Sequence, residues 1–122
     1  MDTPHEADTY SVASADSLRI AFTHSIYDSR VEERFEVGAS GFVPVDVRYS
    51  ERRLVDFYGH ESARRDADWW IVRLPAREFS TLTVQASSDA MVHLTIGART
   101  ITLTDGVARL APGACSRAKS HD

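Results

Sequence analysis

The chain lacks the cysteines of a disulfide framework, the long apolar run of a membrane-spanning helix and the clustered glycines of a phosphate-binding loop. Its 122 residues include one cysteine, Cys115, so neither an intramolecular disulfide nor a multi-cysteine metal site can form. The longest apolar run, residues 69–72, is far shorter than the roughly 20 residues that a transmembrane helix needs. The six glycines form no glycine-rich phosphate loop. The fold must therefore be stable without covalent cross-links.

The charge balance and the composition narrow the class of protein. The formal net charge is −4 at pH 7, which argues against a nucleic-acid partner because duplex binding needs a basic face. Hydrophobic residues make up 43% and charged residues 26%, which is typical of a soluble globular protein, and the length suits one domain. The first six residues lack the regions of a signal peptide, so we expect either a cytosolic protein or a trimmed sequence.

Alternation of apolar and polar residues predicts an all-β fold. It recurs at residues 18–23, 31–37, 43–49, 81–85, 91–96 and 100–104, and turn residues separate these stretches. Many short alternating strands with regular turns are typical of a sandwich or barrel. We therefore expect an all-β sandwich or barrel of about eight to ten mostly antiparallel short strands.

Three further features refine this expectation. Both ends are polar and patternless, which predicts a disordered tail at residues 1–9, a single all-β domain at 10–111 and a flexible tail at 112–122. Pro44 cannot donate to a ladder, so its strand should be an edge or be bulged there. Residues 51–65 are highly charged and could hold a helical turn, although Gly59 and the lack of a sustained apolar stripe argue against it.

Two ionisable residues occupy apolar positions of the first predicted hairpin. His24 continues the apolar phase of residues 18, 20 and 22, and Glu33 that of residues 31, 35 and 37. If the strands pair through a turn at residues 26–29, the two side chains project from one face, opposite or diagonal to each other. Because unpartnered polar groups in a core are costly, we expect His24 and Glu33 to interact directly or through one water, with Ser25 or Tyr27 nearby.

This pattern admits three interpretations: a buried pair that fixes the hairpin register, a polar spot at a binding pocket or partner face, and catalysis. A triad of Ser25, His24 and Glu33 is opposed because adjacent residues of a strand point to opposite faces. The five histidines show no close ligand spacing such as His-x-x-x-His. We therefore predict no catalytic residue, no enzymatic activity, no metal site and no cofactor.

Aromatic residues supply the remaining candidates. Phe57, Tyr58, Trp69 and Trp70 could line a pocket, because Trp and Tyr combine apolar area with a polar tip. Strand alternation places Trp69 and Trp70 on opposite faces, so one fills the core and the other is a candidate partner anchor. The candidate binding residues are His24, Ser25, Tyr27, Glu33, Tyr58 and Trp69.

The hairpin segment at residues 22–35, Phe-Thr-His-Ser-Ile-Tyr-Asp-Ser-Arg-Val-Glu-Glu-Arg-Phe, resembles the signature of the "eighteen-fifty" family of bacterial and archaeal domains of unknown function. Those domains carry a similar Thr-His-Ser segment, a short turn, then Val-Glu-Glu and an aromatic. Residues 68–72 and 96–103 also resemble the final strands of the family, so the similarity covers roughly residues 10–110. His24, Ser25 and Glu33 match the first motif.

The resemblance implies a role beside a TRAP transporter of the TAXI class, because family members are typically encoded beside its membrane subunit or fused to it. It implies a non-enzymatic accessory domain that contacts the membrane subunit or the solute-binding protein, on the extracytoplasmic face of the membrane. The alternative is a small-ligand-binding β module with a pocket near His24 and Glu33. The sequence departs from the family by starting without a hydrophobic anchor and by lacking, at residues 52–60, the glycine-rich segment of many members.

Overall fold

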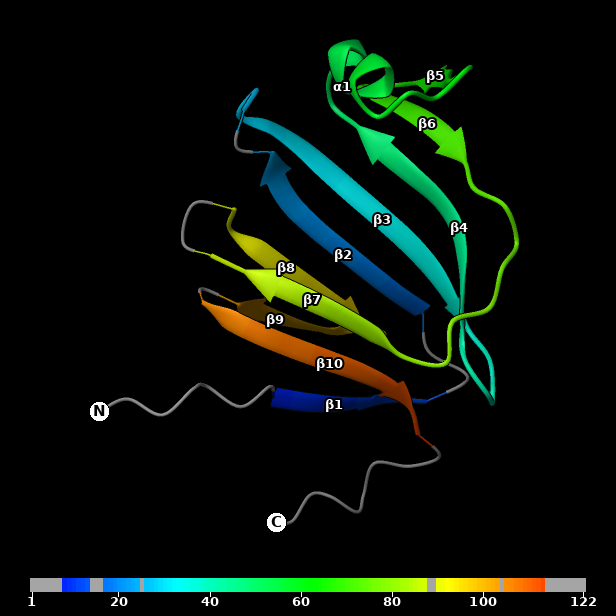
Figure 1. The fold of residues 1–122 in the computed structure, drawn as a ribbon, viewed down its shortest axis with the longest axis vertical. Helices are drawn as coiled ribbons and strands as arrows, with labels where there is room; N and C mark the ends of the chain where they lie inside the picture. Colours follow the sequence, from blue (N-terminus) through cyan, green and yellow to red (C-terminus); the bar gives the residue numbers. More distant parts are fainter. Residues whose placement is uncertain (1–7, 14–16, 25, 88–89, 104, 114–122) are drawn as a thin grey trace.

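The computed structural model describes residues 8–13, 17–24, 26–87, 90–103 and 105–113, and in them ten strands form two sheets (Figure 1). The smaller sheet has the order β1 (Asp8–Val12), β10 (Gly106–Pro112) and β7 (Leu82–Ala86). The larger sheet has the order β5 (Arg64–Asp66), β6 (Trp69–Arg73), β4 (Phe42–Tyr49), β3 (Ser29–Val37), β2 (Ser17–His24), β8 (Val92–Ile96) and β9 (Arg99–Leu103). β1 and β10 are parallel, whereas the other described pairs are antiparallel. The predicted all-β sandwich is confirmed.

The inner face of the larger sheet is covered by two different elements. The smaller sheet covers β2 and β8, where Leu18 and Leu94 pack with Leu110 in the main core. Helix α1 (Arg52–Phe57) covers β3, β4 and β6, where its buried Leu54 and Val55 form a second core cluster. The apolar alternation of the central strands produces this arrangement, because every second side chain faces inward.

Charged side chains dominate the outer face of the larger sheet. The Arg34 guanidinium donates two hydrogen bonds to Asp46, with Nε 2.8 Å from Oδ1 and Nη2 2.6 Å from Oδ2. These hydrogen bonds hold the pKa of Asp46 below its ordinary value. Arg48 adds a longer contact, with its Nε 3.7 Å from Asp46 Oδ1. The outer face thus carries a charge-paired cluster around Asp46, whose side chain is buried beneath its arginine partners.

Pro44 lies at a β-bulge, as one of the two sequence alternatives predicted. Arg34 pairs with Asp46 but Phe35 pairs with Pro44, so Val45 is the extra residue. β4 is not an edge strand, because β3 and β6 flank it. The β6 ladder ends at Asp46 and Arg73, so the missing amide of Pro44 interrupts no bond to β6.

Gly59 ends the helical segment that the sequence suggested. With Tyr58 as the C-cap, Gly59 has φ 75°, its N–H bonds Asp56 O at 3.0 Å, and the His60 N–H bonds Val55 O at 3.0 Å. These two bonds form a Schellman motif, which requires a left-handed residue at this position. The motif fixes how Tyr58 leaves the helix.

The predicted domain limits lie within two residues of the outermost strands. Residues 8, 9 and 112 belong to β1 and β10, so the predicted tails are shorter by those residues. Gly113 is also described, and the remainder of both tails, residues 1–7 and 114–122, lies outside the described residues. In the part of the chain that the structure describes, no helix has the length and hydropathy needed to cross a membrane.

Candidate functional site

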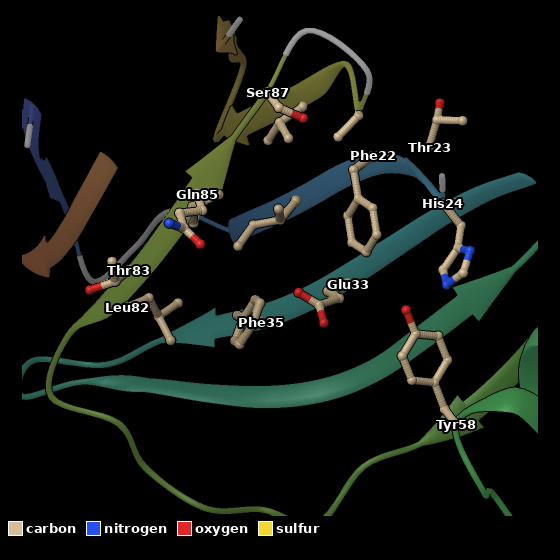
Figure 2. A pocket seen from close by; sticks show the side chains of 14 residues that line it. Phe22, Thr23, His24, Glu33, Phe35, Tyr58, Leu82, Thr83, Gln85 and Ser87 are labelled. Atoms are coloured by element: carbon tan, nitrogen blue, oxygen red, sulfur yellow. The ribbon is translucent and has the colours of Figure 1, made fainter. Parts of the chain in front are cut away.

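A cleft of about 570 Å³ lies between the two sheets, beside the end of α1 (Figure 2). Its walls combine the β2–β3 hairpin with segments distant from it in sequence: the residue after α1, β7, and residues 90 and 92 at the start of β8. β2 and β3 supply the floor, β7 one side, and the residue after α1 the other. The side chains that shape it are Ile20, Phe22, His24, Glu33, Phe35, Tyr58, Leu82 and Val84.

The floor of the cleft is aromatic and aliphatic with one carboxyl group. Phe22 and Phe35 are half-buried and continue the inward phase of β2 and β3. Glu33 follows the same phase and pairs with Ile20 across the ladder. In Figure 2 the Glu33 carboxyl lies on β3 between Phe35 and His24 and points into the cleft.

Glu33 is the one inward-facing acid of this floor, and it has no partner among the described side chains. Neither a hydrogen bond nor an ion pair joins its carboxyl to any residue that the structure describes. Burial raises the pKa of Glu33 above its ordinary value. The carboxyl is therefore an available acceptor in a partly desolvated setting.

His24 and Glu33 share a face, as predicted, but no direct bond joins them among the described residues, so only the water-mediated form of the expected contact stays a prediction. His24 pairs with Ser29, whereas Glu33 pairs with Ile20, which lies four positions earlier on β2. At about 3.3 Å per residue, this separation is roughly 13 Å along the strand. The expected opposite or diagonal placement is therefore wrong, although both side chains line the cleft.

The His24 ring instead belongs to an aromatic cluster. It stacks on Tyr27 with centroids 5.6 Å apart, and contacts Phe57 and Tyr58 edge-on at 5.0 Å and 5.7 Å. Its Nδ1 accepts the Ile26 N–H at 3.3 Å. With Nδ1 as acceptor, the neutral ring carries its proton on Nε2. Packing and a turn hydrogen bond, rather than Glu33, hold the His24 ring in place.

Two tyrosines extend this cluster toward Glu33. Tyr58 stacks on Tyr49 at 5.6 Å, and the Tyr49 hydroxyl is 2.8 Å from His60 Nε2. Burial raises the pKa of Tyr58, and the nearby Glu33 charge raises it further. The pKa of Tyr49 is raised well above its ordinary value, first by burial and then by the charges of Tyr58 and Glu33. Both phenols stay neutral, and the Tyr58 hydroxyl points toward the cleft (Figure 2).

The other predicted site residues are dispersed. Tyr27 stacks on His24 and does not line the cleft. The Arg53 guanidinium lies 4.3 Å from the centroid of the Tyr27 ring. Ser25 lies outside the described residues. Trp69 does not line the cleft, so its predicted binding role stays a prediction for the outer face. Trp70 packs against the inner cluster, so the alternation of β6 turns Trp69 to the outer face, where Arg30 lies 5.8 Å from its ring centroid.

Sequence reasoning missed the wall that β7 contributes. Leu82 and Val84 were recognised as an alternating strand, but nothing local indicated that β7 faces the floor formed by Phe22 and Phe35. The inward phase of these two phenylalanines beside Glu33 was the available signal. Among the described residues, no group of three or more His, Cys, Asp or Glu side chains could hold a metal ion.

No protein-family model matches the chain, and neither curated proteins nor solved structures show significant similarity to it. The resemblance of residues 22–35 to the eighteen-fifty family therefore stays a prediction.

Proposed function

We propose that the chain is a non-enzymatic recognition domain whose cleft binds a group that combines an apolar body with a cationic amine. The observation that carries the proposal is the unpartnered Glu33 carboxyl on an apolar floor. A carboxylate in such a place destabilises the fold unless something neutralises it. An amine that binds there forms the ion pair that the chain itself does not supply.

The surrounding side chains suit the same ligand class. The rings of Phe22, Phe35 and Tyr58 line the cleft, and aromatic rings can bind cations as well as apolar groups. The volume of about 570 Å³ falls in the range of small-molecule sites, roughly 300–1,000 Å³. An anionic ligand is disfavoured because it would meet the Glu33 charge.

Three matched probes test the ligand class: phenethylamine, 2-phenylethanol and 3-phenylpropanoate, each titrated while amide shifts are followed by NMR. We expect saturable shifts on β2, β3 and β7 with the amine, weaker shifts with the alcohol and none with the acid. Glu33→Gln should abolish the preference for the amine. Glu32→Gln, which alters the neighbouring acid on the outer face, should leave it unchanged. Equal binding of all three probes would contradict the proposal.

A protein partner is the second candidate, and the position of the hairpin favours it. Phe22, His24, Glu33 and Phe35, which lie in the segment that resembles the eighteen-fifty family, line the cleft. We propose that a TAXI-class membrane subunit or its solute-binding protein supplies the group that binds there. Co-purification of the chain with those subunits, and its loss in Glu33→Gln, tests this. Retention of the full complex by Glu33→Gln would place the contact elsewhere.

A further inference from the structure

The cleft is bordered by an edge of a sheet as well as by side chains. β7 ends the smaller sheet and pairs with β10 on one side. The cleft is lined by consecutive β7 residues, Leu82 to Gln85, whose side chains alternate between the two faces of the strand. The free edge of β7 therefore borders the cleft together with the inward-facing Leu82 and Val84.

An unpaired edge carries backbone N–H and C=O groups that can bind another strand. Proteins usually protect such edges with charged residues or proline. Three of the four edge strands in the described sheets contain charged residues: β5 reads Arg-Arg-Asp, β9 begins with Arg99 and β1 with Asp8. β7 reads Leu-Thr-Val-Gln-Ala and contains neither charge nor proline. Its edge is open to strand addition.

We propose that the occupant of the cleft is an extended segment of a partner protein, which adds to the free edge of β7 as a strand and seats a Lys or Arg side chain on Glu33. This inference rests on the proposed function and names the carrier of the amine. In an added strand, alternate side chains point to the inner face of the larger sheet, where Glu33 faces β7 across the cleft. Backbone bonds to β7 then supply affinity, and Glu33 selects the cation.

Charge complementarity argues against a second copy of this chain as the added strand. β7 itself holds no cation, so pairing two β7 edges would leave both Glu33 carboxyls without a partner. A segment of about five residues matches the length of β7. Its flanking residues would contact Phe22 and Phe35 on the floor, which favours apolar or β-branched neighbours beside the cation.

The test uses the full chain and one synthetic peptide, acetyl-Thr-Val-Thr-Lys-Thr-Val-Thr-amide. Hydrogen exchange of the β7 amides is measured by NMR with and without peptide at millimolar concentration. We expect exchange to slow at every second amide of residues 82–86, because only alternate amides point to the free edge. The amides of β9, a second edge strand, should be unaffected. Replacing the peptide Lys by Gln should weaken binding about tenfold.

Two N-methylated peptides make the test specific for strand addition. One carries N-methyl groups on its odd amides and the other on its even amides. An added strand uses one set only, so one of the two peptides should lose binding and the other keep it. Equal binding of both, unchanged β7 exchange, or equal binding of the Lys and Gln peptides would overturn the inference. Protection of β7 that grows with protein concentration in the absence of peptide would overturn it in favour of a second copy.

The outcomes separate this inference from the proposed function. If phenethylamine binds through Glu33 while the peptide leaves β7 exchange unchanged, the cleft binds small amines and strand addition is wrong. If neither the amine nor the Lys peptide responds to Glu33→Gln, the proposed function fails as well.

Discussion

Glu33 on β3 lies directly opposite Ile20 on β2, in a row of the larger sheet that is otherwise aliphatic. Across the strands the row reads Leu94, Ile20, Glu33, Val47 and Val72. The four aliphatic members are buried. A carboxyl in this position lowers the stability of the fold, and positions that break a packing rule without a compensating contact are where function is to be sought.

The first prediction concerns how the free energy of unfolding depends on pH through the Glu33 carboxyl. Burial raises the pKa of Glu33 from its ordinary 4.5, so the folded chain holds this proton more tightly than the unfolded chain. The free energy of unfolding therefore falls as the pH rises from 4.5 to the higher folded-state pKa, and stays reduced above it. Glu33→Gln should be more stable than the wild type at pH 7, and the difference should vanish as the pH falls below 4.5. Urea unfolding across this pH range measures it.

Glu32→Gln is the matched control, because Glu32 lies on the outer face with its carboxyl 3.8 Å from Arg19. It should give a pH profile close to that of the wild type. If Glu32→Gln raised the free energy of unfolding at pH 7 as much as Glu33→Gln does, the assignment of Glu33 to the inner face would be wrong.

The second prediction concerns the close approach of two loops at Gly41. A Cβ at Gly41 would lie 2.6 Å from both Glu78 Cγ and the Phe79 carbonyl oxygen, next to the Phe42–Phe79 bridge. Gly41→Ala should therefore lower the free energy of unfolding by about 1–3 kcal/mol. At Gly38 the nearest atom to such a Cβ is 3.7 Å away, so Gly38→Ala should change stability by less than about 0.5 kcal/mol. Equal effects in thermal unfolding would contradict the packing argument.

Much of the fold could be predicted from the alternation of apolar residues, whereas the register of the first hairpin could not. A turn centred within residues 26–29 would pair Glu33 with Phe22, diagonal to His24. In the structure Asp28 has φ 54°, and Ser29 already pairs with His24. The ladder is thus shifted by two positions. A shift of two keeps every side chain on its face, which is why the shared face was predicted correctly and the partner was not.

The cleft itself was not predictable from local pattern. Its β7 wall comes from a different sheet, and Tyr58 reaches it because a Schellman motif at Gly59 ends α1. On the sequence alone Gly59 was evidence against a helix, whereas in the structure it terminates α1. Alternation also showed that Trp69 and Trp70 face opposite sides without showing which of them faces inward.

The third prediction concerns the Arg34–Asp46 pair on the outer face. Because hydrogen bonding from Arg34 lowers the pKa of Asp46, the pair stabilises the fold above the ordinary pKa of 3.8 and loses this effect as the pH falls through the lowered value. Asp46→Asn should cost about 1–2 kcal/mol at pH 7, a figure reduced because the Arg34 side chain is 40% exposed. A double-mutant cycle with Arg34→Gln measures the coupling. A coupling near zero would mean that the two hydrogen bonds contribute nothing net.

The last prediction separates the structural role of His24 from binding. His24 is 7% exposed, and its ring contacts Tyr27, Phe57 and Tyr58, so His24→Ala should cost about 2–3 kcal/mol through lost packing. His24→Phe keeps the ring and loses the Nδ1 bond to the Ile26 N–H, so it should recover more than half of that loss. His93→Ala, which removes a solvent-facing hydrogen bond to Thr102 on the outer face, should cost less than about 0.5 kcal/mol.

Urea unfolding of the three variants measures these losses, and phenethylamine titration of the same samples measures binding. Because the proposed contact with the amine is the Glu33 carboxyl, His24→Phe should keep the preference for the amine over 2-phenylethanol. If His24→Ala leaves the free energy of unfolding intact and abolishes binding, His24 is a ligand-contacting residue and the packing role assigned to it here is wrong.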